Sequence, residues 1–92
     1  MRSLIYFTRE LPGLSEDLSE RGFQVYEALT VSEVLYLCEQ HPGLVVVIDH
    51  TVEPGAANEI AARHITLRLK KKATVRDVVW ELSGLISTIQ VQ

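Results

Sequence analysis

The stretch Leu44-Val45-Val46-Val47-Ile48-Asp49 decides the fold, because five consecutive apolar residues stand directly before one carboxylate. A strand that is apolar on both faces must be covered on both faces. This is typical of a central strand in a parallel sheet that is flanked by helices. Ligands of such sheets bind just beyond the carboxyl ends of the strands. Asp49 is therefore the first candidate site residue.

Three other segments have the character of strands. Residues 3–8 are short, apolar and aromatic, which indicates a second buried strand. Residues 23–27 and 65–70 instead alternate apolar with polar side chains, as strands at the edge of a sheet do. We expect the two apolar strands in the middle of the sheet and the two alternating ones at its edges.

Helical signals separate these strands. Pro12 suits the first turn of a helix that carries Leu11, Leu14 and Leu18 on one face. Two capping boxes follow, in which a threonine hydroxyl at the N-cap precedes an acidic residue by three positions. They are Thr30 with Glu33 and Thr74 with Asp77. Residues 55–63 form a short alanine-rich helix, with Ala56, Ala57, Ile60 and Ala61 expected on its inner face.

Strands that alternate with helices form parallel sheets with right-handed crossovers. The sequence therefore predicts one α/β domain over residues 1–92, with the architecture of a flavodoxin-like three-layer sandwich. Its four-stranded parallel sheet has the expected order 2-1-3-4, with helices on both faces.

Composition excludes several classes of protein. Of the 92 residues, 47% are hydrophobic, which is ample for a globular core, and the net charge of −3 is spread along the chain. Binding to nucleic acid depends on clustered Lys and Arg, so nucleic acid is not expected as a partner. The single cysteine, Cys38, excludes an internal disulfide. No signal peptide or membrane-spanning run is recognisable, and we expect a soluble, cytoplasmic protein.

With Asp49 at the end of the third strand, the chain resembles a response-regulator receiver domain. In that family an aspartate at this position accepts a phosphoryl group. Pro54 follows Asp49 one position later than the family's proline does. The run from Leu69 to Thr74 is similar to the lysine-bearing segment that ends the last receiver strand. By this resemblance Lys71 takes the place of the lysine, and Lys72 stands where the family has a proline.

The sequence also differs from the receiver family at the positions that bind magnesium in that family. Receivers hold magnesium with an acidic pair after the first strand, and here those positions are Thr8 and Arg9, with only Glu10 acidic. Magnesium requires hard oxygen ligands, usually from more than one carboxylate or phosphate. The chain also lacks one βα unit before its last strand. We interpret it as a shortened, degenerate receiver, with Thr8, Arg9, Glu10 and Lys71 as a candidate pocket around Asp49.

The remaining candidates for chemistry are Asp49, the histidines with Cys38, and the basic run near the last strand. Asp49 is either a phosphoacceptor or a carboxylate that is solvated or caps the next helix. The three histidines and Cys38 lack the spacing of metal ligands, so no metal site is expected. No glycine-rich phosphate loop follows the first strand, so no cofactor is expected. The basic run from Arg68 to Lys72 is either a solvated strand end or a site for an anion or an acidic partner.

Surplus apolar surface on the last helix is the remaining feature. Its main stripe begins at Val75 and supplies a face for the sheet, whereas Trp80 and Leu85 lie beside that stripe and Ile89 continues it toward the end of the chain. Exposed apolar patches usually mark contacts with partners. We therefore expect a protein partner or self-association, as a homodimer, through Trp80, Leu85 and Ile89. Packing between helices is favoured over pairing of the last strand.

These observations favour a non-catalytic, receiver-like protein-interaction module, of the kind found in bacterial signalling. Two alternatives remain open. One is a phosphotransfer receiver that uses Asp49. The other is a small subunit of an enzyme or carrier assembly, which completes a site only when assembled.

Overall fold

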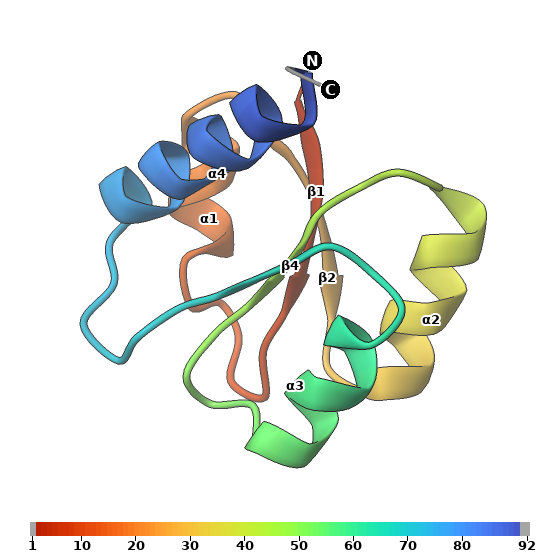
Figure 1. Ribbon diagram of the computed structural model, residues 1–92. Helices are drawn as coiled ribbons and strands as arrows, with labels where there is room; N and C mark the ends of the chain where they lie inside the picture. Colours follow the sequence, from red (N-terminus) through yellow and green to blue (C-terminus); the bar gives the residue numbers. More distant parts are fainter. Residues whose placement is uncertain (1, 91–92) are drawn as a thin grey trace.

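The computed structural model describes residues 2–90, and the side chains of residues 2–85. Strands and helices alternate through the chain (Figure 1). The strands are β1 (Ser3–Phe7), β2 (Gln24–Ala28), β3 (Val46–Ile48) and β4 (Thr66–Arg68). The helices are α1 (Ser15–Glu20), α2 (Val31–Gln40), α3 (Pro54–Ala61) and α4 (Val75–Gln90). None of the helices in this part of the chain is both long and apolar enough to cross a bilayer.

The four strands form one parallel sheet in the order β2-β1-β3-β4, which confirms the predicted topology. Both central strands are buried along nearly their whole length, because they are apolar on both faces. The register pairs Phe7 of β1 with Ile48 of β3. The residues that follow these two strands therefore emerge side by side at the carboxyl edge of the sheet.

Helices cover both faces of the sheet, as expected of a flavodoxin-like fold (Figure 1). On one face, α2 and α3 enclose a cluster that includes Ile5 and Ile48. On the other, α1 and α4 enclose a cluster that includes Leu4 and Val47. Each large apolar side chain that is fully buried in these clusters stabilises the fold by roughly 1.5–3 kcal/mol.

Both predicted threonine caps are present, and the second also has the reciprocal bond that completes a capping box. The Thr30 hydroxyl accepts a hydrogen bond of 3.1 Å from the backbone N–H of Glu33 at the start of α2. Before α4, the Thr74 hydroxyl accepts from the backbone N–H of Asp77 at 3.3 Å, and the Asp77 carboxylate accepts from the backbone N–H of Thr74 at 2.9 Å. These bonds satisfy N–H groups that the first turn of a helix leaves without partners.

Some local expectations are wrong. Helix α1 begins at Ser15 rather than near Pro12, and Leu11 is exposed instead of sharing a buried face with Leu18. Gly13 has a φ of +51°, which is outside the helical region, so the chain forms a loop there before the helix begins. Ala61 of α3 and Ile65 before β4 are also exposed, because the short helix and the edge strand are covered on one side only.

Candidate functional site

The candidate site lies where β1 and β3 end. The backbone N–H of Asp49 donates to the carbonyl of Phe7 at 3.1 Å, which continues the pairing of the two strands by one residue. Thr8 and Asp49 therefore stand next to each other, as the sequence predicted. Both side chains are nearly inaccessible to solvent, since Thr8 is 0% and Asp49 6% exposed.

The Asp49 carboxylate accepts four hydrogen bonds from the protein itself. Its Oδ2 atom accepts from the Tyr6 hydroxyl at 2.9 Å and from the Thr8 hydroxyl at 2.7 Å. Its Oδ1 atom accepts from the Thr51 backbone N–H at 3.0 Å and from the Thr51 hydroxyl at 2.5 Å. A carboxylate has about four lone-pair positions, so these donors fill its capacity.

Each of the three hydroxyls that donate to Asp49 also accepts a hydrogen bond from a backbone N–H group. The Tyr6 hydroxyl accepts from the backbone N–H of Leu14 at 3.0 Å, and the Thr8 hydroxyl accepts from that of Glu10 at 3.1 Å. The Thr51 hydroxyl accepts from the backbone N–H of Arg9 at 2.8 Å. A hydroxyl has a single proton, and in each case the proton is free to point at Asp49. We call Tyr6, Thr8, Asp49 and Thr51 the carboxylate network; it ties the loop after β1 to the loop after β3.

The network changes the acidity of its members. Burial raises the pKa of Asp49, but the hydrogen bonds from Thr51, Thr8 and Tyr6 outweigh that effect, so the pKa is lowered from its ordinary value. Burial raises the pKa of Tyr6 above its ordinary value; the hydrogen bond from the Leu14 N–H lowers it in part, and the hydrogen bond to Asp49 and the charge of that carboxylate raise it further. At neutral pH the carboxylate is therefore ionised and the phenol keeps its proton.

Gly13 is required for the loop after β1 to close over the network. A Cβ atom at this position would lie 2.5 Å from the Tyr6 hydroxyl and 3.2 Å from Oδ2 of Asp49. The φ of +51° also disfavours any residue with a side chain. Backbone, not a side chain, therefore borders the carboxylate on this side.

The other predicted pocket residues are placed differently. The Arg9 guanidinium makes two hydrogen bonds of 3.0 Å to the Glu53 carboxylate and a third, of 2.6 Å, to the carbonyl of Leu29. It also lies over the Phe7 ring, 5.1 Å from the ring centre. Glu10 is exposed and enters the network through its backbone only.

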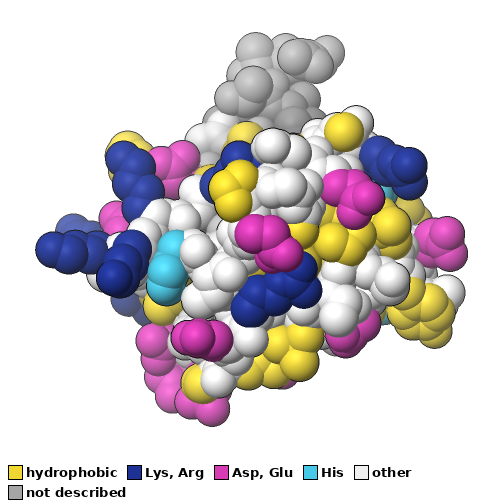
Figure 2. Space-filling view, turned by 90° about the horizontal axis from the view of Figure 1, so that it is seen from below, with side chains coloured by type: hydrophobic (Ala, Val, Ile, Leu, Met, Phe, Trp, Pro, Cys, Tyr) yellow, Lys and Arg dark blue, Asp and Glu magenta, His cyan; other side chains and the backbone are white. Residues whose placement is uncertain are grey.

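Lys71 lies on the same side of the molecule as Asp49. Both residues line a cavity of about 250 Å³ at the carboxyl edge, together with Tyr6, Gly13 and His50 among others. Lys71 is exposed, and within residues 2–85 no ion pair joins it to Asp49. Figure 2 views this end of the molecule and shows several basic side chains together on one side of it, with others scattered among acidic and hydrophobic side chains over the rest.

Two network members, Tyr6 and Thr51, were not predicted as site residues, and neither was the neighbouring Gly13. Two signals for them exist in the sequence. A tyrosine in a fully buried strand needs a partner for its hydroxyl. A threonine two positions after an aspartate suits the local turn in which the aspartate accepts the N–H two residues on.

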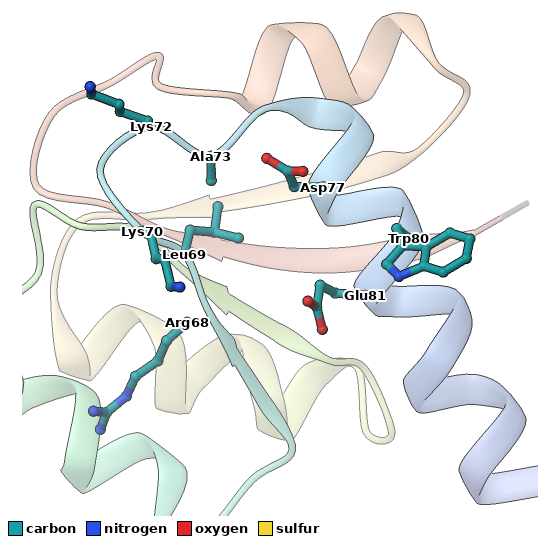
Figure 3. A pocket seen from close by; sticks show the side chains of 8 residues that line it. All are labelled: Arg68, Leu69, Lys70, Lys72, Ala73, Asp77, Trp80 and Glu81. Atoms are coloured by element: carbon teal, nitrogen blue, oxygen red, sulfur yellow. The ribbon is translucent and has the colours of Figure 1, made fainter.

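A second feature lies between the edge strand and the last helix. The groove has a volume of about 350 Å³ and is lined by Arg68, Leu69, Lys70, Lys72, Ala73, Asp77, Trp80 and Glu81 (Figure 3). We call it the β4–α4 groove. Trp80 is 79% exposed at one end of it, and Leu85 is half-buried further along α4. Ile89, the third residue of the predicted interaction surface, lies outside the described side chains.

Comparisons with protein-family models, with curated proteins and with solved structures found no match to this chain.

Proposed function

We propose that this protein is a non-catalytic protein-interaction module with the topology of a shortened receiver domain. In this proposal Asp49 acts as a structural carboxylate that holds two loops at the carboxyl edge of the sheet. The β4–α4 groove is the surface through which the module contacts a partner.

One observation carries the first half of this proposal: the protein's own groups donate four hydrogen bonds to the Asp49 carboxylate and fill its capacity to accept them. A phosphoacceptor needs an oxygen that is free to attack phosphorus and a cation that stabilises the charge of the transferring group. Here each carboxylate oxygen already accepts two hydrogen bonds. The residues that take the place of the family's acidic pair are a buried threonine and an arginine whose guanidinium is bound to Glu53.

The second half rests on the exposure of Trp80. Tryptophan is enriched in the energetically important parts of protein interfaces. A side chain of this size that is 79% exposed, at the end of a groove whose lining includes the apolar residues Leu69 and Ala73, supports a role in binding another protein. Assembly with other proteins, as a subunit of an enzyme or carrier complex, would use the same surface.

Phosphotransfer remains the second candidate, and one observation favours it. Lys71 lines the same cavity as Asp49, and a lysine in that place would neutralise charge on a phosphoryl group. For transfer to occur, the Asp49 carboxylate would first have to lose hydrogen bonds to Thr8 or Thr51.

Incubation with acetyl phosphate and Mg²⁺, followed by intact-mass measurement, separates the two candidates. We expect no phosphoryl adduct on the wild-type protein under conditions that fully modify a working receiver domain run in parallel. An adduct that forms on the wild type and is absent from Asp49→Asn would overturn the non-catalytic proposal.

A further inference from the structure

We propose that the occupant of the β4–α4 groove is a second copy of this chain. In the dimer the two copies are related by a two-fold axis, and α4 of each copy covers the groove of the other. This inference rests on the proposed function and specifies its partner.

The groove combines an apolar floor with an uncovered aromatic side chain. Leu69 and Ala73 supply apolar surface in its lining, and Trp80 stands at its rim on α4 (Figure 3). Trp80 is the most exposed of the large hydrophobic residues within the described side chains, at 79%. In a two-fold arrangement one Trp80 from each copy reaches the groove of the other, so both are covered by a single contact.

The groove carries opposite charges on its two sides, which favours a second copy of this chain as the partner. Arg68, Lys70 and Lys72 lie on its strand side, whereas Asp77 and Glu81 lie on its helix side. A two-fold interface brings the same surface of both copies together, so the basic side of one can meet the acidic side of the other. A purely acidic or purely basic partner would match one side and repel the other. Within residues 2–85 no ion pair inside the chain engages Lys70, Lys72 or Glu81.

The shape of the edge favours a helix over a strand as the occupant. β4 has only three residues in the sheet, and a positive charge lies within it at Arg68. Short length and charge are the devices by which edge strands avoid pairing with other strands. The Arg68 side chain is also held by a hydrogen bond to Asn58 of α3. Helix α4, with 16 residues, is the longer element and carries the exposed Trp80.

Sedimentation equilibrium at micromolar concentration measures the dimer directly. We expect the wild type to dimerise and Trp80→Ala to weaken the dimer by tenfold or more, because the central aromatic contact is lost. The matched control is Tyr36→Ala, which removes an aromatic side chain that is 61% exposed on α2, away from the groove. It should leave the dissociation constant unchanged. Far-UV circular dichroism checks that each variant is folded.

Charge reversal tests the two-fold arrangement more sharply. Lys70→Glu and Glu81→Lys should each weaken the dimer by about tenfold, because each places like charges across the interface twice. An equimolar mixture of the two variants should form a heterodimer about as tight as the wild-type dimer, since opposite charges then meet at both places. A pair inside one chain would not be restored by mixing.

A wild-type protein that stays monomeric at every concentration would overturn the inference, and so would a dimer whose affinity is insensitive to Trp80→Ala and to both charge reversals. Neither result bears on the acetyl phosphate measurement, so the failure of the dimer and the failure of the non-catalytic proposal are distinguishable.

Discussion

Replacing Asp49 with alanine should destabilise the fold strongly, although the residue lies at the edge of the sheet and outside both apolar clusters. In Asp49→Ala the Tyr6 hydroxyl and the Thr51 backbone N–H lose their acceptor. The other two donors have substitute acceptors, because the carbonyl of Glu10 lies 3.1 Å from the Thr8 hydroxyl and the Thr8 hydroxyl oxygen lies 3.0 Å from that of Thr51.

The expected change in the free energy of unfolding follows from these contacts. A buried donor that is left without a partner costs about 1–3 kcal/mol, so the two donors together cost about 2–6 kcal/mol. The variant no longer buries a charged carboxylate, which offsets part of this loss. We therefore expect the free energy of unfolding to fall by about 2–4 kcal/mol at pH 7. In a domain of this size each kilocalorie lowers the Tm by about 4–8 °C.

Equilibrium unfolding in urea, followed by far-UV circular dichroism, provides the measurement. The matched control is Glu59→Ala, which removes an exposed carboxylate from α3 and should change stability by less than about 0.5 kcal/mol. If Asp49→Ala were as stable as this control, the four hydrogen bonds to the carboxylate would not hold the loops together, and the structural role assigned to Asp49 would be wrong.

Two further predictions concern the same network. Because the pKa of Asp49 is lowered in the folded state, its contribution to stability is present above the unfolded pKa of about 3.9 and is lost as the pH falls through the folded value. The difference in unfolding free energy between the wild type and Asp49→Ala should therefore shrink as urea titrations move from pH 6 toward pH 2, and a pH-independent difference would contradict this. Gly13→Ala should destabilise the fold by about 1–3 kcal/mol, because the new Cβ would meet the Tyr6 hydroxyl and the residue would have a strained φ. The control is Gly55→Ala in α3, which has open space around it and should be neutral or slightly stabilising. Equal Tm values for the two variants would argue against the close approach at Gly13.

The topology could be predicted because it depends on patterns within single segments. The run from Leu44 to Ile48 is apolar on both faces and had to be central, and the alternating segments 23–27 and 65–70 had to be edges. The capping threonines act on residues only three positions away, so they too could be identified from local sequence.

The composition of the site could be predicted only in part. Thr8 was expected near Asp49 from the resemblance to receiver domains, and the pairing of β1 with β3 places the two residues side by side. Tyr6, in contrast, donates to a residue 43 positions away in the chain, and no local pattern specifies that pairing. The direction of the Arg9 side chain depends on Glu53, which is 44 positions away, so the sequence could not show that the guanidinium is bound there.

The central claim is that Asp49 is a structural carboxylate whose acceptor positions are filled by the protein. A ¹³C NMR pH titration of the Asp49 side-chain carboxyl signal, recorded with and without Mg²⁺, tests this claim most directly. If the protein's own donors fill this carboxylate, its pKa lies below the ordinary value of about 3.9, and Mg²⁺ leaves its chemical shift unchanged at neutral pH. A pKa at or above the ordinary value, or a shift that saturates with Mg²⁺, would show that the carboxylate is available to a cation and would contradict the structural role proposed for Asp49.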